Sequence, residues 1–121
     1  MRLFTLGLVC FAASLATPCV ADKGVENAMK SVVVVRTPDG LGTGFVVGDG
    51  TLIATNYHVI EGVGKIWFEV PDGPSVTCDG YLAAMPTLDL AVLKAAAVID
   101  RPPLTLSPTE VAAGTDVFAI G

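Results

Sequence analysis

The stretch GFVVGDGTLIAT, residues 44–55, decides the fold of this chain. Its two apolar segments flank the pair Asp49-Gly50, and such a pair between strand-like segments is a strong signal of a β-hairpin. Short apolar segments separated by turn residues recur along the chain after residue 30, whereas no apolar period of about 3.6 residues persists long enough for a substantial helix. The sequence therefore predicts an all-β domain, either a small antiparallel barrel or a sandwich.

Further strands are expected on both sides of this hairpin. The glycine-rich GLGTG, residues 40–44, precedes a strand and not the helix that a phosphate-binding loop requires. Its glycines are therefore expected to let a strand bend or approach another backbone closely. The additional strands are predicted at residues 31–36, 65–70, 75–85, 89–96 and 116–120.

The N-terminus has the layout of a secretory signal peptide. One positive charge, Arg2, precedes an apolar stretch that is shorter than the roughly 20 residues of a membrane span, and a small residue, Ala21, ends the segment. We expect residues 1–21 to be removed, which would place the protein in the periplasm or outside the cell, with no membrane association afterwards. A lipid on Cys19 is the alternative, which Pro18 disfavours. Residues 22–30 then form a lead segment, and residues 31–121 form the domain.

Composition excludes several partners. The chain has a formal net charge of −5 at pH 7 and no basic stripe, which argues against binding to nucleic acid or to anionic membranes. Two of the three cysteines, Cys10 and Cys19, fall in the expected signal peptide. Cys78 is then alone, so no intrachain disulfide can form, and a small buried apolar residue is its expected role. Nothing in the sequence indicates a cofactor.

His58 is the only histidine of the chain, and Asp89 differs from the four aspartates that precede a glycine and are explained as turn residues. Asp89 lies in the apolar run TLDLAVL, where a carboxylate needs a partner. One predicted hairpin separates the two residues, so both should lie at the same end of the sheet and can be in contact. A carboxylate that holds an imidazole is the general-base half of a nucleophilic hydrolase. A zinc site needs three or four ligands, and no second histidine exists.

The segments GTGFVV, LIATNYHVIEG, DLAVLK and VFAIG resemble successive blocks of the trypsin-like serine proteases, most closely the periplasmic high-temperature-requirement, or Do-like, branch. The resemblance covers nearly all of residues 31–121. It implies that these residues form an antiparallel barrel of six to seven strands, the first of two barrels. It also implies that His58 is the general base and that Asp89 orients it. Polypeptide substrates and the ability to form an oligomer are further implications.

The chain departs from this family at the nucleophile. The Gly-x-Ser-Gly-Gly block of the family belongs to the second barrel and does not occur in these 121 residues. No residue present has the glycine-rich setting that a replacement would need, which applies to Ser31, Ser75, Ser107 and Cys78. We therefore expect the N-terminal part of a serine endopeptidase, incomplete at its C-terminus and inactive alone. The alternative is a non-catalytic single barrel that binds peptides or other partners at an exposed edge.

Overall fold

The computed structural model describes residues 23–121, so the expected signal peptide, residues 1–21, lies outside the described part. A short helix, α1, occupies most of the lead segment, and six strands follow. None of the helices within residues 23–121 is long and apolar enough to cross a membrane. The elements are α1 (Lys23–Met29), β1 (Val32–Thr37), β2 (Gly40–Val47), β3 (Leu52–Thr55), α2 (Tyr57–Ile60), β4 (Trp67–Glu69), β5 (Ser75–Met85), the 3-10 helix η1 (Pro86–Leu88) and β6 (Leu90–Ala95).

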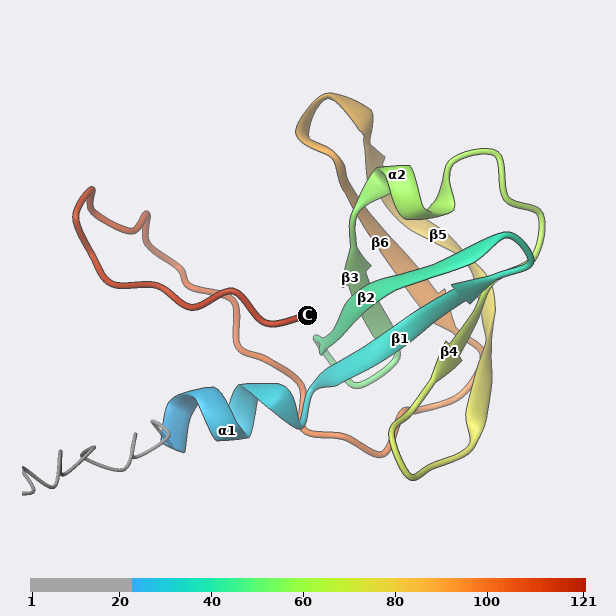
Figure 1. Ribbon diagram of the computed structural model, residues 1–121, viewed down its shortest axis with the longest axis horizontal. Helices are drawn as coiled ribbons and strands as arrows, with labels where there is room; N and C mark the ends of the chain where they lie inside the picture. Colours follow the sequence, from blue (N-terminus) through green and yellow to red (C-terminus); the bar gives the residue numbers. More distant parts are fainter. Residues whose placement is uncertain (1–22) are drawn as a thin grey trace, which may run out of the picture.

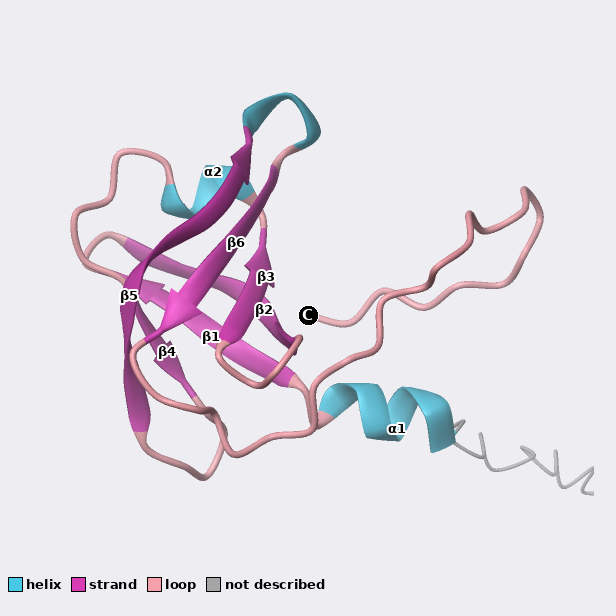
Figure 2. Ribbon diagram, turned by 180° about the vertical axis from the view of Figure 1, so that it is seen from behind, coloured by secondary structure: helices cyan, strands magenta, loops and turns pink. Residues whose placement is uncertain are grey.

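The strands form a closed barrel in the order β1-β2-β3-β6-β5-β4, with β4 pairing back to β1. Every pairing between neighbouring strands is antiparallel. The prediction of a small all-β antiparallel barrel is thus confirmed, with six strands (Figure 1). Figure 2 shows that α2 and η1 lie at one end of the barrel, whereas α1 lies toward the other end.

The barrel encloses one apolar core. Residues on β1 alternate between half-buried and fully buried, as expected for a strand with one face inward. The largest fully buried side chain is Phe68 of β4, which packs with Ile53 of β3 and Leu93 of β6 in the same core cluster. Burying side chains of this size contributes about 1.5–3 kcal/mol each, so this core is what holds the two ends of the barrel in place.

Two glycines of β2 lie so close to neighbouring side chains that a Cβ atom at either position would collide with them. A Cβ on Gly44 would lie 2.6 Å from Ile53 Cγ2 and 2.8 Å from Val35 Cγ2, and a Cβ on Gly42 would lie 2.6 Å from Val59 Cγ2. The prediction of close approach to another backbone at GLGTG is confirmed in part, because side chains make the tightest contacts and the Ala54 backbone oxygen would lie 3.4 Å from a Cβ on Gly44. Gly42 bears on the position of His58, because Val59 belongs to α2, which also carries His58.

The expected strand at residues 116–120 is wrong. These residues have no regular secondary structure, and Val117 and Phe118 are 75% and 66% exposed. A strand needs a neighbour to satisfy its backbone groups, and a closed barrel offers few free edges. Figure 1 shows the C-terminal segment, residues 105–121, running away from the barrel and returning toward it only at its end.

A strap of residues 99–104 connects β6 to that segment and crosses the end of the barrel that bears α1. Ile99 is 2% exposed, and its N–H donates a hydrogen bond to the Gly50 carbonyl over 2.9 Å. Farther along the strap, the Leu104 N–H donates to the Val46 carbonyl over 2.8 Å. The strap is thus fixed by a buried apolar anchor and by backbone hydrogen bonds to β2 and the β2–β3 turn.

Candidate active site

His58 lies on α2, the single helical turn that directly follows β3. Asn56 is the N-cap residue of this helix, with an extended backbone (φ −80°, ψ 142°). Ile60 anchors the turn because its side chain is 1% exposed within the core. With one face of α2 held in this way, the His58 side chain points outward and remains 68% exposed.

Asp89 lies between η1 and β6. Pro86 begins η1, and the Asp89 N–H closes that turn by donating to the Pro86 carbonyl over 3.1 Å. Asp89 itself adopts the left-handed conformation, with φ 53° and ψ 41°. We expected Asp89 to begin a strand, and it instead directly precedes β6. Its place in space follows from β6 pairing with β3, with Ala91 opposite Thr55.

The pairing of β3 with β6 brings His58 and Asp89 together. The Asp89 Oδ2 atom lies 2.7 Å from His58 Nδ1, and the Asp89 Oδ1 atom accepts a hydrogen bond from the His58 N–H over 2.8 Å. One carboxylate therefore holds both the backbone and the ring of the same residue. Hydrogen bonds from the backbone and the ring of His58, in that order, hold the pKa of Asp89 below its ordinary value of 3.8.

This geometry determines which imidazole nitrogen is available. An ionised carboxylate accepts hydrogen bonds and donates none, so Nδ1 of His58 carries the proton that faces Asp89. In the neutral ring, Nε2 is then left with a free lone pair on an exposed side chain. Such an imidazole can take a proton from a hydroxyl or thiol, and the carboxylate stabilises the imidazolium that results.

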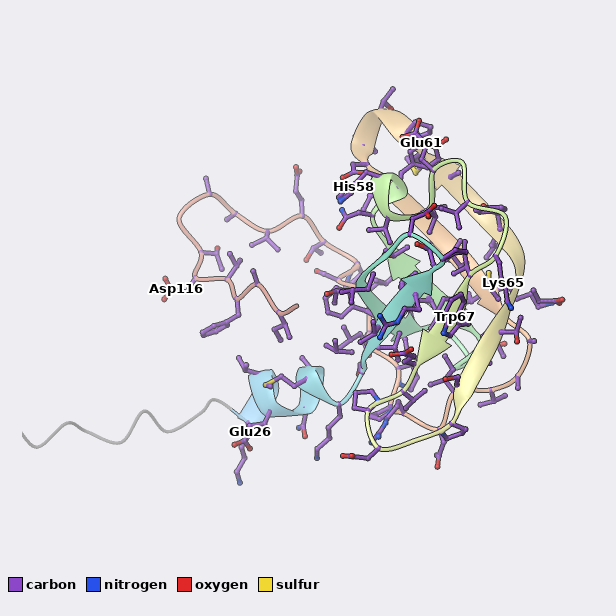
Figure 3. All side chains as sticks on the ribbon, turned by 45° about the vertical axis from the view of Figure 1, so that its right-hand side comes forward. Glu26, His58, Glu61, Lys65, Trp67 and Asp116 are labelled. Atoms are coloured by element: carbon purple, nitrogen blue, oxygen red, sulfur yellow. The ribbon has the colours of Figure 1, made fainter. Side chains whose placement is uncertain are left out.

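The surroundings of His58 leave room for a ligand. A shallow hollow of about 330 Å³ lies between the β1–β2 turn and α2, lined by His58, Leu41, Asp39 and Glu61 among others. Figure 3 shows His58 and Glu61 at the same end of the barrel, whereas Lys65 and Trp67 lie on its flank and Asp116 lies on the C-terminal segment. The lining of the hollow thus combines apolar residues with His58 and two acidic residues.

Three of the four residues considered as replacement nucleophiles make hydrogen bonds outside the pair. Ser31 is 1% exposed and its hydroxyl donates to the Pro102 carbonyl, whereas the Ser107 hydroxyl donates to the Thr109 carbonyl. Cys78 is half-buried against the core, whereas we expected it to be buried. Among residues 23–121, no group of three or more histidine, cysteine or acidic side chains is placed to hold a metal ion.

Sequence reasoning gave Asn56 no role, yet it belongs to this site. Its Nδ2 atom donates to the Asp89 carbonyl over 3.1 Å, and the Tyr57 N–H donates to the same oxygen over 3.1 Å. The signal available in the sequence was an asparagine two residues before the histidine. That signal is ambiguous, because asparagine is also an ordinary residue at the start of a helix.

Comparison with known proteins finds a matching family and several similar proteins. The family described as "Trypsin-like peptidase domain" matches residues 42–121. A probable periplasmic serine endoprotease, DegP-like, from Halomonas elongata is 38% identical over 82 residues, which cover 67% of this chain and 17% of that protein. A protein of the same name from Chlamydia muridarum is 42% identical over 53 residues, 44% of this chain and 10% of that protein. This chain thus spans a small part of the length of these relatives.

The fold is also similar to that of a solved serine endoprotease. The crystal structure of the serine endoprotease from Yersinia pestis superposes with a TM-score of 0.63 at 26% sequence identity. The superposition covers 73% of this chain and 33% of that one. Together with the family match, this superposition confirms the resemblance inferred from the four sequence blocks. It also confirms that the barrel is of the kind found in trypsin-like proteases.

Proposed function

We propose, since this chain belongs to the trypsin-like serine proteases of the Do-like branch, that its barrel supplies the general base and the orienting acid of a serine endopeptidase. The observation that carries the proposal is the 2.7 Å contact between His58 Nδ1 and Asp89 Oδ2, which leaves Nε2 of an exposed imidazole free. A histidine with a merely structural role would have less need of a carboxylate that fixes both its ring and its backbone.

In this mechanism each atom of the pair has one task. Asp89 Oδ2 keeps the proton on Nδ1, so that Nε2 can accept the proton of a serine hydroxyl as that oxygen attacks the peptide carbonyl. The imidazolium that forms is stabilised by the Asp89 carboxylate and then gives its proton to the leaving amine. The hollow beside His58 offers room for the polypeptide on the side of the β1–β2 turn.

The nucleophile and the oxyanion hole would come from a second barrel encoded beyond residue 121. Such a partner would pack on the outer face of β2, β3 and β6, where Leu90 is 48% exposed. The hollow on this face is lined by Phe45, Ala54 and Leu90 together with the C-terminal residues Ile120 and Gly121. Without the second barrel, the pair has no attacking group and no donors for the developing oxyanion. We therefore propose that residues 1–121 alone do not hydrolyse peptides.

The proposed location is the periplasm. Two relatives carry that location in their names, and residues 1–21 have the layout of a signal peptide. The proposed substrate is a polypeptide, and oligomers like those expected from the family would form after export. N-terminal sequencing of exported protein that begins at Asp22 would support this location, whereas a chain that retains Met1 would contradict it.

The activity is tested with two proteins. The DNA after codon 121 is sequenced, and the 121-residue chain is compared with the protein that includes the continuation, using an unfolded polypeptide as substrate. The proposal predicts a Gly-x-Ser-Gly-Gly block in the continuation, hydrolysis by the longer protein only, and loss of hydrolysis in its His58→Ala variant. A continuation without that block, or hydrolysis that survives His58→Ala, would contradict the proposal.

A further inference from the structure

The side chain of Asn56 does not do what an N-cap asparagine usually does. An asparagine at this position ordinarily accepts a hydrogen bond from an N–H in the first turn of its own helix. Here the Asn56 side chain makes no such bond to α2. Its amide instead donates across to the neighbouring turn, from Nδ2 to the Asp89 backbone carbonyl over 3.1 Å. The residue is therefore used as a donor and not as an acceptor.

Asp89 performs the capping that Asn56 leaves undone. The first two N–H groups of α2 both donate hydrogen bonds to Asp89. Tyr57 N–H donates to its carbonyl oxygen, and His58 N–H donates to its Oδ1 atom. The same carbonyl receives the amide of Asn56. Donors at the start of α2 thus all meet acceptors of Asp89, the residue before β6, and the set extends to the contact between Asp89 Oδ2 and His58 Nδ1.

The backbone of Asp89 needs external support. Its φ of 53° lies in the left-handed region, which residues other than glycine adopt infrequently and which aspartate tolerates better than most. Such a conformation persists where the surrounding structure determines it. The donors that fix the direction of the Asp89 carbonyl are Tyr57 N–H, which is part of the helix, and Asn56 Nδ2, which is the only side chain among them.

We propose that Asn56 is a positioning residue that acts through the Asp89 carbonyl to aim the Asp89 carboxylate at Nδ1 of His58. It contacts neither the imidazole nor a reacting atom, so it is not a catalytic residue. Its consequence for peptide hydrolysis rests on the function proposed above, whereas its effect on the imidazole does not. A side chain on one element thus fixes the proton position of the general base through the backbone of another.

The test observes His58, the single histidine of the 121-residue chain, by NMR at a pH at which the imidazole is neutral. The measured quantity is the rate at which the Nδ1 proton of His58 exchanges with water, together with the fraction of the ring protonated at Nδ1. Asn56→Ala should speed the exchange about fivefold, the factor that corresponds to one hydrogen bond of ordinary net strength. Asn27→Ala, on the exposed face of α1, is the matched control and should leave the rate unchanged.

Asn56→Asp separates positioning from helix capping. Aspartate caps helices as well as asparagine does, but its carboxylate cannot donate to the Asp89 carbonyl. We expect Asn56→Asp to behave like Asn56→Ala, and it decides the question if the alanine variant does not fold. The proposal is overturned if Asn56→Asp exchanges at the wild-type rate, or if Asn27→Ala speeds the exchange as much. An inactive longer protein in which Asn56 still controls this exchange would overturn the proposed function and leave the positioning role intact.

Discussion

Replacing Gly42 with alanine should disturb α2, the helix that carries His58 of the candidate active site. The new Cβ would lie 2.6 and 2.7 Å from the two methyl carbons of Val59, well inside the 3.4–4 Å of ordinary contact. Val59 is β-branched, so it has little rotamer freedom with which to move aside. Overpacking of this kind lowers the free energy of unfolding by about 1–3 kcal/mol. Because Val59 follows His58 directly, part of the strain should appear as a displaced imidazole.

Urea unfolding followed by the fluorescence of Trp67, the only tryptophan, measures the loss of stability. Gly40→Ala is the matched control, because a Cβ at Gly40 meets nothing within 4 Å. The double variant Gly42→Ala/Val59→Ala removes the colliding methyl groups and should recover at least about 1 kcal/mol relative to the sum of the single variants. If Gly42→Ala unfolds within about 0.5 kcal/mol of the wild type, the range of harmless substitutions, the steric reasoning is refuted.

Two further perturbations test the barrel itself. The pKa values of Asp49, Glu69 and Asp89 are held below their ordinary values chiefly by hydrogen bonds that the carboxylates accept in the folded state. The unfolded chain therefore binds more protons in acid, so urea midpoints should fall as the pH drops from about 5 toward 3, and constant midpoints would contradict this. Ile99→Ala empties a buried position under the strap and should lower the free energy of unfolding by about 2–5 kcal/mol. Val98→Ala, at a 66% exposed neighbour, should have little effect in the same urea titration. If both variants lose the same free energy of unfolding, Ile99 does not anchor the strap.

Local turn chemistry made much of the fold predictable. The pair Asp49-Gly50 marks the β2–β3 hairpin, and the predicted strand at residues 75–85 has the bounds of β5. The juxtaposition of His58 with Asp89 could also be inferred, because counting strands places their two element ends side by side. Each of these inferences depends on residues that are close in sequence or on one intervening hairpin.

What the sequence left undetermined depends on contacts between distant segments. The run at residues 116–120 has the composition of a strand, but whether it forms one depends on a partner that this barrel does not offer. Asn56 and Asp89 are similar cases. Their residue types suit a helix start and a turn, and only the folded chain shows that each one serves the other element.

The central claim is that Asp89 holds His58 as the general base for peptide hydrolysis. It is tested most directly by kcat for peptide cleavage by the protein extended through the proposed second barrel, compared with the Asp89→Asn variant of that protein. The variant keeps the shape of the side chain but favours the wrong tautomer of the imidazole, a change that lowers kcat by about 10⁴ in a Ser-His-Asp triad. A folded Asp89→Asn variant with a loss of that order is the predicted result. A variant whose kcat stays near that of the parent enzyme would contradict the claim.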